Sequence, residues 1–400
     1  MADYDPFRPS YLENPYPSLT RLRHEDPVHF ARKLEGWVVS RHEDARTVLM
    51  DVDRFGNDPG TATMGLGAHV AATRQHSPLG HVPLLGSSDP PVHTRLRSII
   101  SRLFTPRRME ASRPQIREQI DELLDRASAE GRSDFMSKVA HPLPVHLVGG
   151  LLGLTEQDRG PVRHWTSAVM RVIGGGDLPP SAYRQAEQAT DKLQVFLESF
   201  AETHEGESIL ASIVAAEANP DRLSADEAVA FLTFLYQAGG GPTAMMLGNA
   251  VLTLLRHPDQ WRQLRDDPSL ARSALIETLR WDSATHVLLR FAREDTTLGK
   301  RSIAAGDTMF VLIVAAHRDP ELFSDPDRFD ITREVDTTDV LSFGLGPHFC
   351  LGQPLALIQG EEMLKAMVER FPDVALPRDG LTRSQELLLR GPARMELTWS

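Results

Sequence analysis

The sequence has a single cysteine, Cys350, among its 400 residues. One cysteine cannot form an intramolecular disulfide, and it cannot supply the several thiolates that a Cys-rich zinc site or an iron–sulfur cluster needs. A lack of disulfides is typical of proteins in the reducing cytosol. The sequence therefore excludes an internal disulfide and a Cys-rich zinc site.

Long apolar runs are also missing. The longest one, residues 309–316, is far shorter than the ~18 apolar residues that predict a membrane-spanning helix. Residues 1–9 lack the basic stretch and the following apolar stretch of a signal peptide. We therefore expect a cytoplasmic protein with no membrane partner.

Positive charge is in the minority. The 43 Lys and Arg residues are outnumbered by 55 Asp and Glu residues, which gives a net charge of −12. This balance argues against a nucleic-acid partner, because a phosphate backbone attracts basic surfaces. A local basic patch can override it for one partner.

Most periodic segments have a helical pattern. Ser224 and Glu227 form a capping-box pattern at the start of a long helix that we expect to end near Arg256. No composition break marks a linker, so we expect one domain over residues 1–400. We also expect a monomer. Further helices are predicted over residues 113–129, 181–201 and 270–281, strands over 28–30, 37–39 and 395–399, and a long loop over 58–92.

The segment around the cysteine carries the strongest chemical signal. Residues 343–352 read Phe-Gly-Leu-Gly-Pro-His-Phe-Cys-Leu-Gly, and their glycines and proline predict an irregular loop that can approach a flat partner closely. The loop delivers Cys350 to the start of an apolar helical segment, where the helix dipole stabilises a thiolate. A lone thiolate can be the axial ligand of a haem. A buried structural cysteine in a turn is the alternative.

This segment matches every fixed position of Phe-Gly-x-Gly-x-His-x-Cys-x-Gly, the haem-ligand signature of the cytochrome P450 monooxygenases. The sequence therefore resembles that family, and the resemblance extends over nearly the whole chain. It implies a mainly α fold with small β sheets. It also implies haem b between the long I helix and the cysteine-bearing L helix, next to Phe343, with Cys350 as the axial ligand of the iron.

The resemblance implies an ion network beneath the haem. Glu277 and Arg280 match the family's Glu-x-x-Arg motif, and their i,i+3 spacing puts them on one helix face. Arg328, in Pro-Asp-Arg-Phe, matches the segment that supplies the third member. Alone, Glu-x-x-Arg fits any surface helix.

Four basic residues are expected to bind the haem propionates by resemblance: His93, Arg97, Arg290 and His348. Two carboxylates need cationic or N–H donors, which agrees with this set. Taken singly, each residue could equally be a surface charge.

A basic cluster follows His93 in the sequence. The resemblance implies that it docks an acidic electron donor while Arg97 turns inward, and a solvated face is the alternative. The chain has no room for a flavin or nicotinamide domain, so NAD(P)H electrons should arrive through a ferredoxin reductase and a ferredoxin. The cluster comprises Arg95, Arg97, Arg102, Arg107 and Arg108.

The middle of the long helix departs from the family. Members usually carry Ala-Gly-x-acid-Thr-Thr, in which the acid and the alcohol help to deliver protons. Here Gly241 replaces the acid and Pro242 the alcohol, and neither side chain can relay a proton. Thr243 matches only the second threonine. Proline also deprives the Ala238 carbonyl of its helical donor, so we expect a kink and a carbonyl free to hold water.

Three explanations of this departure stay open. The substrate supplies the missing hydroxyl or carboxyl, or ordered waters replace it, or the reaction needs less proton delivery. The last group includes peroxide-driven oxidation, phenol coupling and rearrangement. Fatty-acid peroxygenation is not well supported, because Gly241 stands where those enzymes have arginine. A haem-thiolate protein that binds or senses without activating oxygen is an alternative from another class.

By resemblance, four regions wall a substrate pocket above the haem. The residues there are apolar, as pocket linings mostly are, although each fits ordinary core packing equally well. Family analogy implies hydroxylation, epoxidation, or oxidative coupling or rearrangement of a small, largely apolar molecule, free or carrier-bound, in secondary-metabolite or antibiotic biosynthesis. The lining candidates are Met64, Leu66, Val169, Met170, Ile173, Val287, Leu288, Leu387 and Leu388.

Overall fold

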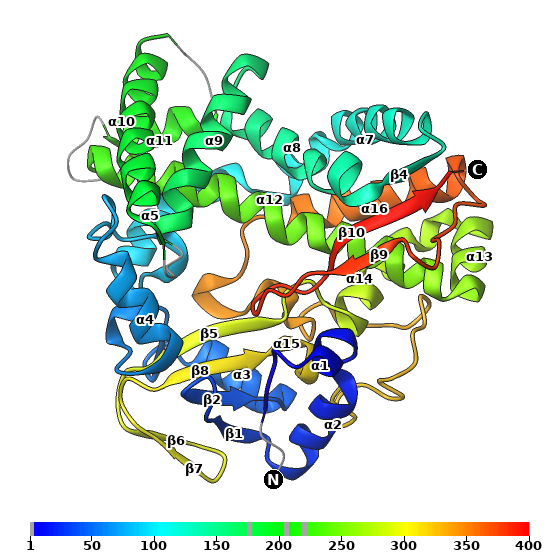
Figure 1. The fold of residues 1–400 in the computed structure, drawn as a ribbon, viewed down its shortest axis with the longest axis horizontal. Coiled ribbons are helices and arrows are strands. Elements are labelled where there is room, and N and C mark those ends of the chain that lie inside the picture. Colours follow the sequence, from blue (N-terminus) through cyan, green and yellow to red (C-terminus); the bar gives the residue numbers. More distant parts are fainter. Residues whose placement is uncertain (1–3, 174–177, 204–207, 218–222, 400) are drawn as a thin grey trace.

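The computed structural model describes residues 4–173, 178–203, 208–217 and 223–399. The fold is mainly helical, with small sheets at one end and along one side (Figure 1). Its helices are α1 (Pro9–Glu13), α2 (Tyr16–Glu25), α3 (His42–Met50), α4 (Gly65–Arg74), α5 (Val92–Ile100), α6 (Pro106–Ala111), α7 (Arg113–Ser128), α8 (Pro142–Leu152), α9 (Glu156–Ile173), α10 (Pro180–Thr203), α11 (Ile209–Glu217), α12 (Ala225–Arg256), α13 (Pro258–Asp266), α14 (Ala271–Trp281), α15 (Ile313–Ala316) and α16 (Gln353–Arg370).

Three sheets complete the described part of the chain. The five-stranded sheet has the order β1-β2-β8-β5-β3, and β1 and β2, which contain two of the predicted strands, form an antiparallel hairpin. A three-stranded sheet, β4-β10-β9, and the pair β6-β7 are smaller. The strands are β1 (Val28–Ala31), β2 (Gly36–Val39), β3 (Phe55–Gly56), β4 (Arg132–Asp134), β5 (Val287–Ala292), β6 (Thr296–Leu298), β7 (Arg301–Ile303), β8 (Thr308–Leu312), β9 (Leu381–Arg383) and β10 (Pro392–Thr398).

The long helix α12 crosses the middle of the molecule, with α8 to α11 on one side and the five-stranded sheet on the other (Figure 1). It begins as predicted: the Ser224 Oγ accepts a hydrogen bond from the Glu227 N–H, and the Glu227 carboxylate accepts one from the Ser224 N–H. The helix continues through Pro242 to Arg256. A bend at the proline stays a prediction.

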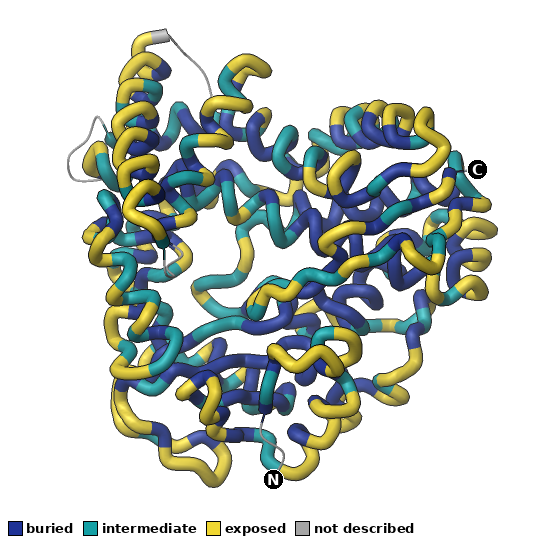
Figure 2. Tube along the Cα trace, viewed as in Figure 1, coloured by how far each residue is buried: buried dark blue, intermediate teal, exposed yellow. Residues whose placement is uncertain are grey.

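Two large hydrophobic clusters share α12. Residues 228–232 and 236 pack in one cluster with α9, α10 and α11, and most of residues 244–254 pack in the other with α7, α14 and α16. Between them, residues 237–242 are less buried than either flank, apart from the buried Gly240 (Figure 2). The middle of the longest helix is therefore the part that the packing leaves most open.

The prediction of a long loop over residues 58–92 is corrected, because this stretch contains α4. The helix is rich in small residues, so its sequence shows little apolar periodicity. Packing places it instead: a Cβ on Gly67 would lie 2.6 Å from the Phe291 ring of the sheet.

Candidate functional site

Cys350 lies in the loop that leads into α16. Its backbone N–H donates to the Phe343 carbonyl at 2.9 Å, which closes the loop. The loop requires glycine at two positions, because Gly344 and Gly346 have φ angles of +71° and +70°. The sequence prediction of an irregular loop before a helix is thus confirmed.

Cys350 has exposed surface, but protein atoms surround its sulfur on most sides. This burial raises the pKa of the thiol. The N–H groups of Gly352 and Gln353 and the charge of Arg97 oppose that rise and favour the thiolate. A cation bound to the sulfur would tip the balance further toward the thiolate. The residue therefore fits a single soft ligand to one metal ion.

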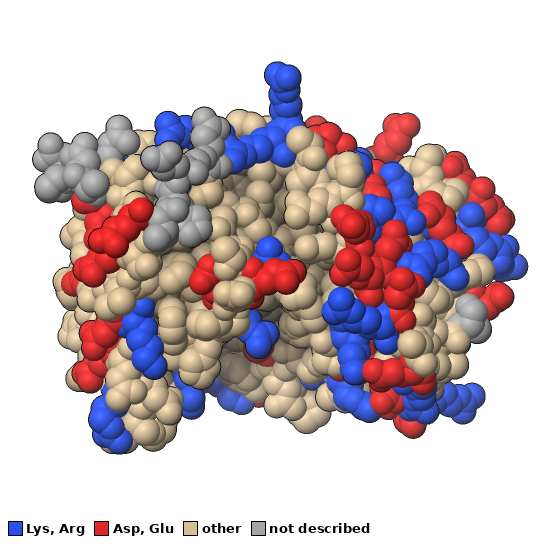
Figure 3. Space-filling model, turned by 90° about the horizontal axis from the view of Figure 1, so that it is seen from above, with Lys and Arg blue, Asp and Glu red and all other residues tan. Residues whose placement is uncertain are grey.

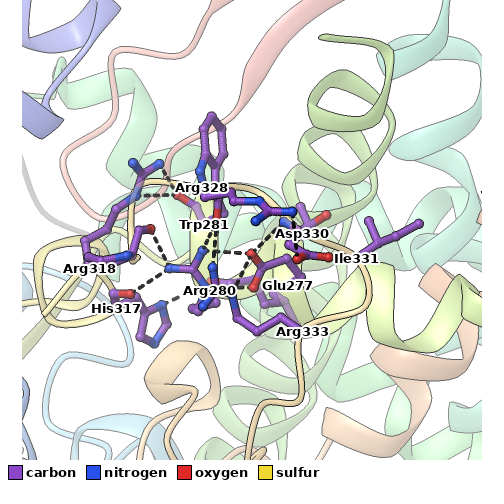
Figure 4. Close-up of polar contacts among 12 residues, drawn as sticks. Glu277, Arg280, Trp281, His317, Arg318, Arg328, Asp330, Ile331 and Arg333 are labelled. Carbon is purple, nitrogen blue, oxygen red and sulfur yellow. Dashed lines mark hydrogen bonds and ion pairs between the residues drawn. The ribbon is translucent and has the colours of Figure 1, made fainter. Parts of the chain in front are cut away.

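Glu277 and Arg280 of α14 form a fully buried ion pair (Figure 4). Two hydrogen bonds join the side chains: Arg280 Nε donates to Glu277 Oε2 at 2.6 Å, and Arg280 Nη2 donates to Glu277 Oε1 at 2.8 Å. Arg280 also donates to the carbonyls of His317, Pro326 and Arg328 at 2.8–3.1 Å. Buried charges need such satisfied partners.

The third side chain of this network is Arg333, which corrects the prediction of Arg328. Arg333 Nε lies 3.2 Å from Glu277 Oε1, whereas the Arg328 side chain is 65% exposed and pairs with Asp330 at 3.4 Å. Only the backbone carbonyl of Arg328 enters the network, because the chain turns between the two arginines (Figure 4). The sequence shows two arginines in this segment but does not show which of them points toward Glu277.

Hydrogen bonds link this network to the cysteine loop. The Leu341 N–H donates to His317 Nε2 at 2.7 Å, and the His317 carbonyl accepts from Arg280. Ser342, directly before the loop, bonds to the Leu279 carbonyl at 3.2 Å and accepts from Thr285 through its own carbonyl at 2.9 Å. The ion network thereby holds the start of the loop.

The four basic residues predicted around the propionates converge from three places. His93 and Arg97 come from α5, Arg290 from β5, and His348 from the cysteine loop. The rings of His93 and His348 lie 4.0 Å apart, and Arg97 donates to the Phe349 carbonyl at 2.8 Å. The four side chains therefore lie close together, and their role in binding the propionates stays a prediction.

The electrostatics of this group favour an anionic ligand. Burial lowers the pKa of Arg290 to about 10. Burial and the neighbouring cations lower the pKa of His348 to about 3, and burial and Arg97 also lower that of His93. The Nε2 of His348 is buried without a hydrogen-bond partner among the described residues. Two carboxylates would satisfy these groups.

The thiol and the cationic group together fit a haem. Cys350 would hold the iron, and His93, Arg97, Arg290 and His348 would hold the propionates. When bound, haem supplies iron redox chemistry, while the protein supplies binding and orientation.

The distal segment of α12 has no proton-donating side chain at the expected places. Ala238 is exposed, Gly241 and Pro242 are half-buried, and Thr243 is buried. Gly241 has room for a side chain, because the nearest atom to an added Cβ is Leu389 Cδ1 at 4.0 Å. An acidic side chain would therefore fit at position 241, and it is absent only because the residue is glycine.

A protein-family model described as Cytochrome P450 matches residues 180–399. The cytochrome P450 monooxygenase PikC of Streptomyces venezuelae is 38% identical over 379 aligned positions, which cover 92% of this chain and 86% of that protein. The chain belongs to the cytochrome P450 family. It is therefore a monooxygenase, which favours the enzyme over the binding or sensing alternative.

Two further similarities cover the whole P450. The 6-deoxyerythronolide B hydroxylase of Saccharopolyspora erythraea is 35% identical over 400 aligned positions, which cover 95% of this chain and 96% of that protein. The epothilone D-bound cytochrome P450epoK has a TM-score of 0.90 and 28% identity, with 100% of both chains covered. The predicted fold class is confirmed, and membership implies the haem.

The predicted lining of the P450's substrate pocket stays a prediction. Val169, Ile173 and Val287 are no more than 5% exposed and pack in hydrophobic clusters. Leu288 lies 3.8 Å from a Cβ built on Gly344, beside the cysteine loop. The remaining candidates are exposed or half-buried, and their role stays a prediction: Met64, Leu66, Met170, Leu387 and Leu388.

Leu389 is a residue that the sequence prediction missed. It pairs with Thr285 as an isolated β bridge and faces Gly241 of α12. The two neighbouring leucines were predicted instead, because a turn without regular periodicity does not reveal which side chain points inward. Leu387 packs against the N-terminal cluster, and Leu388 is 40% exposed.

The arginines of the predicted docking cluster do not all face solvent. Arg97 turns inward as expected. Arg95 forms an ion pair with Glu227 of the α12 cap, so it is bound within the fold and not part of an open patch. Arg102 and Arg107 are exposed.

Charged side chains gather at one end of the P450 (Figure 3). Acidic and basic groups alternate there on α7 and α16, for example Arg117 with Asp121 and Glu369. The same view shows the surface hollowed near its middle. Among the described residues, no helix is long and apolar enough to cross a bilayer.

Proposed function

We propose that this P450 oxidises a largely apolar secondary metabolite of macrolactone type, by hydroxylation in the first instance. The relatives support the proposal, since one is a 6-deoxyerythronolide B hydroxylase and one structure holds epothilone D. Leu389 beside the distal helix and Leu288 beside the cysteine loop are apolar, which agrees with such a ligand. Epoxidation, oxidative coupling and rearrangement are the alternative reactions for the same haem-thiolate enzyme.

We also propose that the protons for the reaction come from the substrate or from ordered water. The observation that carries this is the Gly241-Pro242 pair, which offers no proton-bearing side chain, beside a Thr243 that is only 9% exposed. The proline removes the N–H that would bond to the Ala238 carbonyl. That oxygen can then accept a hydrogen bond from a water or a substrate hydroxyl.

The test begins with an optical titration of the haem-loaded protein against macrolactones, free and tethered to a carrier protein. The compound that shifts the spin state is then compared with its O-methyl analogue, and product per NADPH consumed is measured. We expect lower coupling with the analogue if the substrate hydroxyl supplies protons. Equal coupling assigns that task to water.

Engineered side chains complete the test. Gly241→Asp with Pro242→Thr restores an acid and an alcohol, and the space at Gly241 permits this. Gly241→Asn with Pro242→Thr is the matched control, because the amide has a similar shape and no titratable proton. We expect the Asp variant alone to restore coupling with the analogue. Where the analogue couples less well than the hydroxyl compound, unchanged coupling in both variants would contradict proton supply by the substrate.

We propose that NAD(P)H electrons reach the haem through a ferredoxin reductase and a ferredoxin that docks near Arg102 and Arg107. Both arginines are exposed and follow α5, which carries His93 and Arg97. Opposite charges accelerate such encounters at low salt. Arg107→Glu should slow reduction by ferredoxin and weaken its salt dependence, whereas reduction by dithionite should not change.

A further inference from the structure

The turn that carries Leu389 is held by the N-terminal segment of the chain. Arg390 donates through Nη1 to the Leu12 carbonyl at 3.0 Å and through Nε to Asp282 at 3.1 Å. Tyr16 donates to the same Asp282 oxygen at 2.7 Å. The residues around α1 and the C-terminal turn are therefore one hydrogen-bonded unit, although they lie at opposite ends of the sequence.

A second connection runs through buried rings. The hydroxyls of Tyr4 and Tyr11 lie 2.9 Å apart, and the Tyr11 hydroxyl lies 2.9 Å from His286 Nε2. All three side chains are at most 5% exposed. The backbone N–H of His286 donates to the Leu388 carbonyl at 2.8 Å, directly before Leu389.

The Tyr11 bond matters to His286 because the ring has little other support. Burial lowers the pKa of His286 to about 3, so the ring is neutral. Its Nδ1 is buried without a hydrogen-bond partner among the described residues. Loss of the Tyr11 hydroxyl would leave both ring nitrogens unpaired, which favours movement of the ring.

Tyr11 and Leu389 line the same small cavity, together with His286 and Leu387. Leu389 also faces Gly241, where an added Cβ would lie 4.0 Å from the Leu389 Cδ1. A shift of the turn toward or away from Tyr11 therefore changes the space beside the distal segment of α12.

We propose that Tyr11 is a positioning residue, which sets the place of Leu389 in the distal pocket through His286 and the Leu388 carbonyl. The N-terminal segment thus shapes a pocket wall that it does not line. The inference needs only the haem-loaded P450 and not turnover, so it can fail or hold independently of the proposed substrate.

The experiment uses Tyr11→Phe in the haem-loaded protein, with Tyr4→Phe as the matched control that keeps the bond between Tyr11 and His286. The probes are imidazole, which reaches only the iron, and 4-phenylimidazole, whose phenyl ring extends to the pocket wall. We expect the Kd of 4-phenylimidazole to change about 3- to 10-fold in Tyr11→Phe, the range of one buried hydrogen bond. The Kd of imidazole, and both Kd values in Tyr4→Phe, should change less than about twofold.

A double-mutant cycle tests the route of the effect. In a Leu389→Ala background, Tyr11→Phe should no longer change the Kd of 4-phenylimidazole. Amide hydrogen exchange should increase in residues 384–391 of Tyr11→Phe and stay unchanged in residues 343–352. The proposal is overturned if both probes respond equally, if neither responds, if the effect persists without Leu389, or if Tyr11→Phe no longer binds haem.

Discussion

Arg333 and Arg328 provide a sharp test of the buried ion network. Arg333 is 13% exposed and contacts Glu277 at 3.2 Å, while it donates to the carbonyls of Asp325 and Arg328 at 3.0 and 3.1 Å. Its removal leaves the fully buried Glu277 with one cation instead of two, and the two carbonyls with one donor fewer each, since Arg280 still donates to the Arg328 carbonyl and the Arg328 N–H to the Asp325 carbonyl. The change to be made is Arg333→Ala, with Arg328→Ala as the matched control.

Breaking a buried ion pair costs about 3–5 kcal/mol, and the partial exposure of Arg333 together with the remaining Arg280 reduces this to about 2–3 kcal/mol. Arg328 is 65% exposed and pairs with Asp330 on the surface, so its loss should cost about 0–1 kcal/mol. The free energy of unfolding is measured by urea titration of each variant. Because the network holds the start of the cysteine loop, Arg333→Ala should also lower the fraction that gives the thiolate carbon monoxide spectrum.

The reasoning is refuted if Arg328→Ala destabilises the protein as much as Arg333→Ala. That result would show that the arginine named from the sequence, and not the one found in the structure, completes the network. If Arg333→Ala lowers the free energy of unfolding but leaves the carbon monoxide spectrum unchanged, the ion network stabilises the fold without holding the cysteine loop.

Three further predictions follow from the same packing. Gly239→Ala should cost about 1–3 kcal/mol in urea unfolding, because its Cβ would lie 2.5 Å from Val148, whereas Gly241→Ala should cost nothing measurable. Burial lowers the pKa of His317 to about 3, so the free energy of unfolding should fall by up to about 1.4 kcal/mol per pH unit from pH ~6.5 toward 3, and less steeply in His317→Gln. Arg290→Leu should speed haem transfer to apomyoglobin about 10- to 100-fold, the effect of one charged hydrogen bond; an unchanged rate would remove Arg290 from the propionate site.

Local sequence chemistry predicted the elements that depend on neighbours along the chain. The long helix begins at Ser224 and Glu227 because a capping box satisfies its own N–H groups. The cysteine loop takes its form from glycines whose φ angles other residues avoid. The small residues of α4 lack such a local signal, so only packing against the sheet revealed that helix.

The sequence by itself determined the family of the fold, the irregular loop that carries Cys350 and the unusual Gly241-Pro242 pair, because these depend on residue identity and spacing. Only the tertiary structure decided that Arg333 reaches Glu277, that Arg95 joins the α12 cap, and that Leu389 faces the distal helix. The direction of each of these side chains depends on turns and contacts between segments far apart in the chain. No spacing along one segment contains that information, which is why the fold was predictable and the wall of its pocket was not.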